Sequence, residues 1–137
     1  RKGICQTVIH ENPDLDILPV LKCWPHDGGR FITLPMVHTI HPVTRNTNIG
    51  MYRMQILDKN LTAMHWQLHK TGAAHFDAWK KTGRLMPVSV ALGGDPIYAY
   101  AATAPLTENL NEYILAGFMR RKKVKLVKCI TNDLYVP

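Results

Sequence analysis

The chain has 137 residues, the length of one domain, and a formal net charge of +7. Its residues are 46% hydrophobic and 20% charged, a composition that is typical of a folded protein and excludes a disordered chain. No run of about 18 apolar residues occurs, so the sequence encodes no membrane-spanning helix. Cys5, Cys23 and Cys129 form an odd set without a CxxC pair, which argues against a disulfide framework and against a cysteine zinc site.

The first third of the chain predicts short strands after an irregular start. Residues 1–19 are interrupted by prolines and are expected to be an extended lead-in. Strands are expected at 20–23 and 31–34, separated by the turn signal at 27–29, and again at 36–41.

Residues 50–57 and 61–69 each alternate in the manner of a half-buried strand, with turn chemistry between them, so they predict a hairpin. This hairpin places Arg53 opposite Met64 or His65. The register is open by one residue, and a slip of one residue exchanges the two faces.

The same hairpin brings Asn48 opposite His69 or Lys70. An amide oxygen and an imidazole nitrogen suit a cation such as Mg²⁺ or Mn²⁺, which keeps positions open for phosphate oxygens. The alternative is a hairpin whose polar side chains simply face water.

The second half of the chain mixes short helices with strands. Helices are expected at 73–81, closed by Gly83, at 97–102, with Asp95 as N-cap and Pro96 in the first turn, and from Asn109 or Asn111 through Phe118, and strands at 87–92 and 124–130. The pattern does not repeat βαβ units cleanly. It therefore predicts a mainly β domain with inserted helices (α+β), closer to a barrel than to a doubly wound sheet.

A basic run, residues 120–123, is followed by Lys125 and Lys128. The positive charge favours anionic partners such as phosphates or carboxylic acids. Aromatic residues do not interleave with the run, so no nucleic-acid partner is expected. The run is expected to be a solvated turn between helix and strand, or a surface that faces other domains.

Two further motifs have competing interpretations. His65 and His69 have the spacing of a helical zinc pair, but they lie in a predicted strand and no HExxH pattern is present, so zinc is discounted. Trp24 and Trp66 fit stacking on an aromatic cofactor and core packing equally well.

Four motifs, CWPHDGG (23–29), NIGMYRMQ (48–55), LGGDP (92–96) and KCITNDL (128–134), come in the order found in UbiD-family decarboxylases. The chain resembles that family from about Asp16 onward. The resemblance implies a split β-barrel related to flavin-reductase-like FMN-binding domains, spanning residues 20–137. It also implies reversible, non-oxidative decarboxylation of aromatic or α,β-unsaturated carboxylic acids, of the quinone-biosynthesis type, with prenylated FMN, Mn²⁺ and often K⁺.

The resemblance also implies roles for individual residues. Asn48 and His69 resemble metal ligands, and Arg53 resembles the catalytic arginine that holds the departing carboxylate. The residues that resemble the flavin-lining segments are Met51, Tyr52, Arg53, His65, Trp66, Gln67, Lys70 and Thr71.

In the family, a glutamate that completes the metal site is expected just past residues 134–137, and the acids that protonate the product lie further on. The chain is therefore expected to be the central domain of a longer, homo-oligomeric enzyme, inactive without its N- and C-terminal domains. Its expected partners are a small aromatic acid and a flavin prenyltransferase that supplies the cofactor. A cytoplasmic location is expected, peripheral to the membrane where the substrate is a prenylated quinone precursor. The rival hypothesis is an FMN-binding or scaffold split-barrel module without catalysis.

Overall fold

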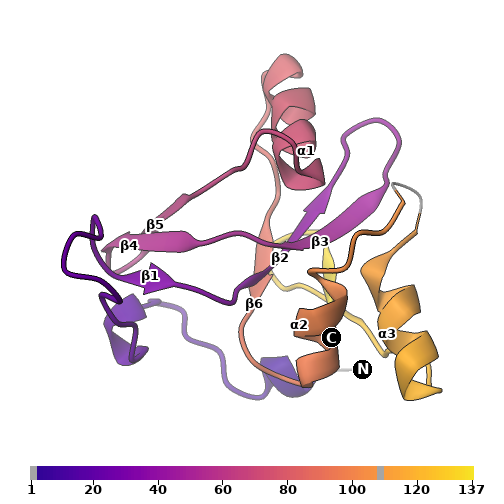
Figure 1. Ribbon diagram of the computed structural model, residues 1–137, viewed down its shortest axis with the longest axis horizontal. Coiled ribbons are helices and arrows are strands. Elements are labelled where there is room, and N and C mark those ends of the chain that lie inside the picture. Colours follow the sequence, from indigo (N-terminus) through magenta and orange to yellow (C-terminus); the bar gives the residue numbers. More distant parts are fainter. Residues whose placement is uncertain (1–2, 108–109) are drawn as a thin grey trace.

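In the described part of the chain, two three-stranded antiparallel sheets form the body of the domain, and three α-helices pack around one of them (Figure 1). The computed structural model describes residues 3–107 and 110–137. The first sheet has the order β1 (Phe31–Ile32), β4 (Met54–Asp58), β5 (Leu61–Met64), and the second has the order β3 (Thr47–Met51), β2 (Met36–Ile40), β6 (Ser89–Ala91). The remaining elements are the 3₁₀ helices η1 (Ile4–Gln6) and η2 (Leu15–Ile17), the helices α1 (Thr71–Lys81), α2 (Pro96–Ala101) and α3 (Glu112–Arg120), and the ribbon of β7 (Val127–Lys128) with β8 (Tyr135–Val136).

Strand β2 is the centre of the second sheet, and all five of its residues are buried. Met36 on one face packs with Ile49, α2 and α3. Val37 on the other face packs with the first sheet, through Tyr52 and Met54 among others. A strand covered on both faces has no polar side, which explains why β2 shows no apolar–polar alternation.

The predicted hairpin of 50–57 with 61–69 is wrong in its first strand. The chain leaves one sheet and enters the other at Tyr52 and Arg53, so β3 pairs with β2 and only β4 pairs with β5. The alternation continued through this break because Tyr52, like Met54, is buried on the side of the shared core. Asn48 consequently lies opposite Thr39 and not opposite His69.

The half of that hairpin next to the turn, β4 paired with β5, is confirmed. Met54 pairs with Met64, and the backbone N–H of His65 donates to the carbonyl of Arg53 at 3.0 Å, which fixes the open register. The second strand ends at Met64, so the stretch from His65 to Lys70 is irregular and leads into α1.

The predicted helices are confirmed, together with two of their caps. Asp95 accepts a hydrogen bond from the backbone N–H of Ile97 at 3.0 Å, and Asn111 accepts from that of Tyr113 at 2.8 Å. The alternative helix start at Asn109 lies outside the described residues. Gly83, just past α1, has the left-handed φ of 69° that suits glycine at this position.

The lead-in is not extended throughout, because it contains η1 and η2. Four strand predictions also needed correction. Residues 20–23 form no strand, because prolines lie close on both sides, at 19 and 25. Val20 is partly buried against the core of the first sheet, and residues 21–23 are exposed. The strands expected at 31–34 and 124–130 shrink to two residues each, in β1 and β7, and the strand expected at 87–92 shrinks to the three residues of β6. The fold is thus a mixed domain of antiparallel sheets and helices; its described strands form no closed barrel, and the split-barrel form stays a prediction.

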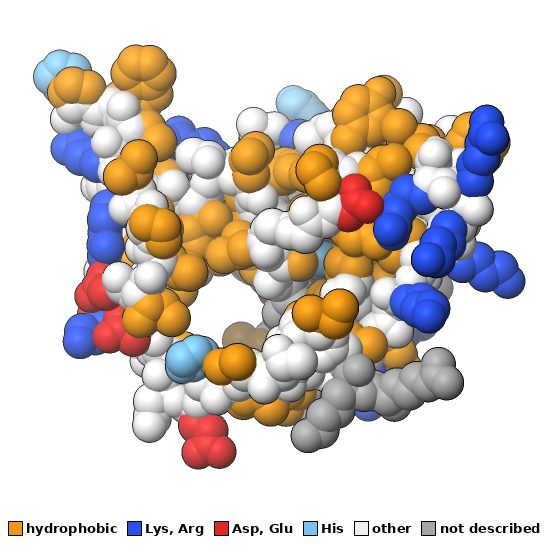
Figure 2. Space-filling model, turned by 90° about the horizontal axis from the view of Figure 1, so that it is seen from below, with side chains coloured by type: hydrophobic (Ala, Val, Ile, Leu, Met, Phe, Trp, Pro, Cys, Tyr) orange, Lys and Arg blue, Asp and Glu red, His pale blue; other side chains and the backbone are white. Residues whose placement is uncertain are grey.

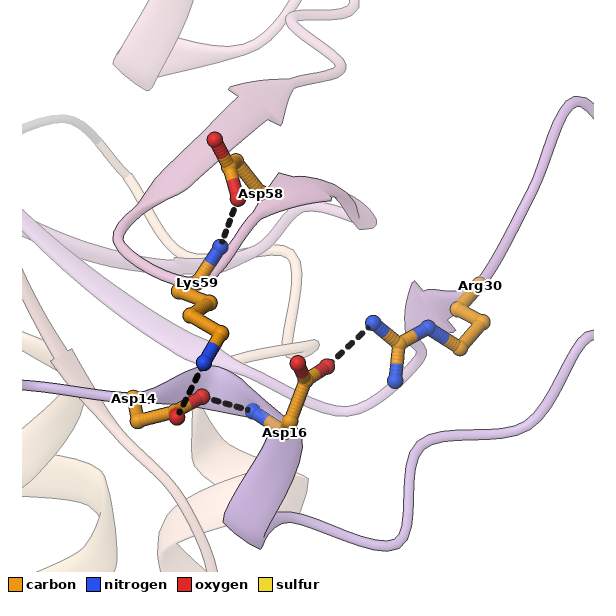
Figure 3. A network of polar contacts seen from close by, with 5 residues as sticks. All are labelled: Asp14, Asp16, Arg30, Asp58 and Lys59. Atoms are coloured by element: carbon orange, nitrogen blue, oxygen red, sulfur yellow. Dashed lines mark hydrogen bonds and ion pairs between the residues drawn. The ribbon is translucent and has the colours of Figure 1, made fainter.

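The lead-in is tied to the first sheet by polar contacts (Figure 3). The Lys59 ammonium lies 3.3 Å from a carboxylate oxygen of Asp14, and the Arg30 guanidinium lies 2.6 Å from Asp16. The backbone N–H of Leu15 also donates to the Lys59 carbonyl at 2.7 Å. Exposed ion pairs of this kind each contribute little to stability, but together they hold η2 against the β4–β5 turn.

Among the described residues, no helix is both long and apolar enough to cross a membrane.

Candidate functional site

Arg53 lies on the surface between β3 and β4, where the chain passes from one sheet to the other, and its guanidinium forms only a long ion pair. Its guanidinium is 4.1 Å from the centre of the Phe31 ring and 3.5 Å from a carboxylate oxygen of Asp27, and its side chain is 44% exposed. The His65 ring meets the same Phe31 ring edge-on at 5.1 Å. Arg53 and His65 are therefore neighbours, as expected, and a long ion pair leaves the guanidinium able to exchange Asp27 for an incoming carboxylate.

The Tyr52 side chain, unlike that of Arg53, is buried in the core, where it contacts residues of the second predicted cofactor-lining segment. Its hydroxyl accepts a hydrogen bond from the backbone N–H of Gly72 at 2.9 Å. The Trp66 ring packs against it at 4.9 Å between centroids, and the Lys70 ammonium lies 5.5 Å from its ring centre. Burial raises the pKa of Tyr52, so the hydroxyl is protonated at neutral pH.

The other predicted cofactor-lining residues are more scattered. Met51 pairs with Met36 and packs with α2 and α3, on the opposite face of β3 from Asn48. Gln67 is exposed, and its carbonyl accepts from the backbone N–H of Lys70 at 3.0 Å. Trp66 is half-buried and stacks with Phe76 of α1.

Asn48 is buried, and its amide nitrogen has no hydrogen-bond partner in the described part of the chain. The amide lies beside the Tyr52 hydroxyl, where it lowers the pKa of that group against the larger effect of burial, but it does not reach hydrogen-bonding geometry. An unpaired buried amide is costly, so this side chain is suited to a partner that the polypeptide itself does not provide.

Glu112 supplies a carboxylate next to Asn48, and the sequence reasoning missed it. One of its carboxylate oxygens accepts a hydrogen bond from the backbone N–H of Ile49 at 3.1 Å, across 63 residues of chain. Burial raises the pKa of Glu112. The N-cap at Asn111 was a usable signal, because it places an acidic residue in the first turn of α3, although it does not say which strand that turn meets.

His69 is exposed and lies at the edge of a cavity of about 400 Å³ beneath the start of α1. The cavity is lined by His41, Thr44, Asn46, Thr47, Leu68, His69, Lys70, Thr71, Ala74 and His75. Thr47, the neighbour of Asn48, therefore shares a cavity wall with His69. Packing of α1 on β3 brings Thr47 and His69 to one cavity, whereas Asn48 lines a different cavity together with His38 and Tyr113. That Asn48 and His69 share one metal site stays a prediction.

Within residues 3–107 and 110–137, no three His, Cys, Asp or Glu side chains form a metal-binding group. The oxygen donors near Asn48 still fit a hard cation. The nitrogen and oxygen of an amide are assigned from its surroundings, so turning the Asn48 amide over places its oxygen where the unpartnered nitrogen lies. That oxygen and the Glu112 carboxylate are the donor types that Mn²⁺ and Mg²⁺ prefer.

His75 is expected to make folding dependent on pH. Burial, with a smaller contribution from His41, lowers the pKa of His75 to about 4 from its ordinary value of 6.5. The unfolded chain therefore binds more protons than the folded one between these pH values, and the stabilising effect of the neutral ring is lost as pH falls from about 6.5 to 4. His38, whose pKa burial also lowers, acts in the same direction.

We expect the free energy of unfolding, measured by urea denaturation at pH 7.5 and 4.5, to fall by on the order of 2 kcal/mol through His75 alone. His75→Asn keeps a polar group near the Thr39 hydroxyl, which lies 2.9 Å from Nδ1, and should flatten the slope. An unchanged slope in that variant would contradict the assignment.

Trp24 and the basic run, residues 120–123, both lie at the surface. Trp24 is 70% exposed and packs in no core cluster. Basic side chains gather at one end of the molecule, on the side where α3 lies in Figure 1 (Figure 2). Arg120 is paired with Asp95 at 3.1 Å, whereas residues 121–123 are exposed.

The chain is similar over its whole length to a known protein family. The sequence model of UbiD, described as the 3-octaprenyl-4-hydroxybenzoate carboxy-lyase Rift-related domain, matches residues 1–137. A relative from Archaeoglobus fulgidus is 50% identical over 99% of this chain and 28% of its own length, and one from Aquifex aeolicus is 44% identical over 100% and 28%. The chain thus spans about 28% of the length of these relatives.

Solved structures agree with the sequence match. The closed form of the vanillic acid decarboxylase of Sedimentibacter hydroxybenzoicus has a TM-score of 0.90 at 27% identity, over 96% of this chain and 29% of that one. An evolved dimeric form of the UbiD-class enzyme HmfF from Pelotomaculum thermopropionicum, in complex with prFMN, has a TM-score of 0.88 at 26% identity, over 94% and 30%. The resemblance of the four motifs is confirmed: this chain belongs to the UbiD family of decarboxylases, as its 3-octaprenyl-4-hydroxybenzoate carboxy-lyase Rift-related domain.

Proposed function

We propose that this chain is the cofactor-binding domain of a reversible, non-oxidative decarboxylase of aromatic or α,β-unsaturated carboxylic acids. The observation that carries the proposal is the buried Asn48 amide, which lacks a protein partner and lies next to the Glu112 carboxylate, in a domain with these structural relatives. A divalent cation is the simplest partner for this pair. The proposed cofactors are prenylated FMN and Mn²⁺, with K⁺ as a further ion.

Asn48 and Glu112 would hold the metal, with His69 as a third donor from the neighbouring segment. Glu112 then takes the role that the sequence reasoning gave to a glutamate beyond residues 134–137. Lys70 and Thr71, at the start of α1, add a positive charge and a hydroxyl to the wall of the cavity that His69 lines. A cation, a lysine and a helix N-terminus together favour a phosphate group, such as that of FMN.

When bound, prenylated FMN supplies the electron sink for the breaking carbon–carbon bond. Arg53 is proposed to bind and orient the substrate carboxylate. Its planar guanidinium can form two parallel hydrogen bonds with a carboxylate, and its exposed position and long contact to Asp27 allow the exchange. His65 packs against the same Phe31 ring as Arg53, so it lies beside the proposed carboxylate site.

The broader context is proposed from the family resemblance. The chain is proposed to work within a longer, homo-oligomeric protein whose further domains provide the proton-donating acids, and to be inactive by itself. Its cofactor would come from a flavin prenyltransferase. A quinone-biosynthesis substrate and a cytoplasmic location, peripheral to the membrane for a prenylated precursor, belong to the same proposal, as does the split-barrel relationship.

The test is binding of flavin to the purified chain. FMN and prenylated FMN are titrated with Mn²⁺ and with EDTA, retention is followed by absorbance and mass spectrometry, and decarboxylation of aromatic acids is assayed alongside. We expect retention that depends on Mn²⁺ and no turnover. Turnover by the chain alone would refute the inactivity, and flavin retention that ignores EDTA would refute the metal. Failure to bind either flavin under all conditions would favour the scaffold hypothesis.

A further inference from the structure

Tyr52 is fixed in place by two glycines that leave room for its ring. A Cβ added at Gly50 would lie 2.5 Å from the ring carbon Cε2, and one added at Gly72 would lie 2.6 Å from the hydroxyl oxygen. Real Cβ atoms do not approach so closely, and the Tyr52 side chain is only 3% exposed, so the ring cannot move aside cheaply. The two glycines come from β3 and from α1, so the ring lies where these elements meet.

The polar contacts of Tyr52 reach the same two elements. Its hydroxyl accepts the hydrogen bond from the Gly72 N–H, one of the N–H groups in the first turn of α1 that have no partner within the helix. The Asn48 amide lies beside that hydroxyl from β3. One side chain thus lies beside the proposed metal ligand on one strand and is hydrogen-bonded to the start of the helix that follows His69.

Its ring contacts belong to the other proposed flavin-lining segment. Trp66 packs edge-on against the ring, and the Lys70 ammonium lies over it, in the geometry of a cation–π contact. Arg53 is the next residue along the chain. Tyr52 is therefore in contact with both segments to which the sequence assigned the cofactor, while it is itself turned away from the surface.

We infer that Tyr52 is a positioning residue, which sets the distance between the Asn48 strand and the 66–72 segment and so shapes the flavin and metal site without touching the substrate. The inference rests on the proposed function. It follows from geometry: a buried ring clamped by two glycines and hydrogen-bonded to a helix start is a rigid spacer, and binding sites need such support to hold donors in place.

The test is Tyr52→Phe, which removes the hydroxyl and keeps the ring. The matched control is Tyr98→Phe, which removes a hydroxyl that accepts from Arg120, between α2 and α3. Both variants lose one hydrogen bond, so both should melt at slightly lower temperatures. Only Tyr52→Phe should weaken flavin binding in the presence of Mn²⁺, by about tenfold, and speed the exchange of the Gly72 amide hydrogen.

Binding is measured well below the melting temperature, so a merely structural role would leave the flavin affinity of Tyr52→Phe equal to that of Tyr98→Phe, and this result would overturn the inference while the proposed function stands. Failure of the wild-type chain to bind flavin would overturn both. A second measurement needs no variant: addition of flavin and Mn²⁺ to the wild type should slow exchange at Gly72 more than at Tyr98, and equal effects would overturn the inference.

Discussion

Replacement of Trp79 with alanine should lower the free energy of unfolding by about 4 kcal/mol, since removal of a buried tryptophan or phenylalanine side chain costs 3–5 kcal/mol in other proteins. Trp79 is only 6% exposed and joins Ile40 and Leu134 in a core cluster. Its indole N–H donates to the Ile40 carbonyl at 2.6 Å, so the variant also leaves that acceptor, at the end of β2, without its partner. A domain of this size is stable by about 5–15 kcal/mol, so much of the reserve would be lost.

The measurement is urea denaturation followed by circular dichroism, with Trp24→Ala as control. Trp24 is 70% exposed and packs in no core cluster, so its loss should change stability by less than about 0.5 kcal/mol. Equal losses in the two variants would contradict the packing described for α1.

Replacement of Glu112 with glutamine should weaken Mn²⁺ binding by at least about 100-fold, the upper end of what loss of a residue that merely supports a metal ligand costs. Glutamine keeps the size of the side chain and an oxygen that can accept from the Ile49 N–H, so the fold should survive. What is lost is the negative charge at the peptide that joins Asn48 to Ile49. The affinity is measured by titration calorimetry with Mn²⁺ in the presence of flavin.

Glu11→Gln is the matched control, because it removes one negative charge from an exposed position in the lead-in. It should leave the Mn²⁺ affinity unchanged. Wild-type affinity in Glu112→Gln would show that Glu112 is not a ligand, and it would return the search for the acidic ligand to the longer relatives. An equal loss in both variants would mean that Mn²⁺ responds only to net charge.

Local features were predictable where the chemistry is local. The caps at Asp95 and Asn111 form hydrogen bonds within two residues of themselves, so short stretches of sequence are enough to locate α2 and α3. The same holds for the β4–β5 turn. Arg53 and His65 were paired correctly because only a short turn and two strands separate them.

Prediction failed where the partner lies far along the chain. The alternation from Gly50 to Leu57 fits one continuous strand as well as two strands in different sheets. The structure shows that the chain changes sheets at Tyr52, whose side chain is buried between Gly50 and Gly72. Glu112 reaches Ile49 across 63 residues, and His38 bonds Tyr113 across 75. The periodicity of apolar residues along the chain does not predict such long-range contacts.

By itself the sequence determined the helices, the capping residues of α2 and α3, the surface charge and, through four short motifs, the family. Those depend on interactions between near neighbours or on residue identity alone. Only the tertiary structure decided that β3 pairs with β2, that Glu112 accepts from the Ile49 N–H next to Asn48, and that Tyr52 faces inward. Strand edges and buried polar groups must find partners anywhere in the chain, and packing of the whole domain selects which partners they find.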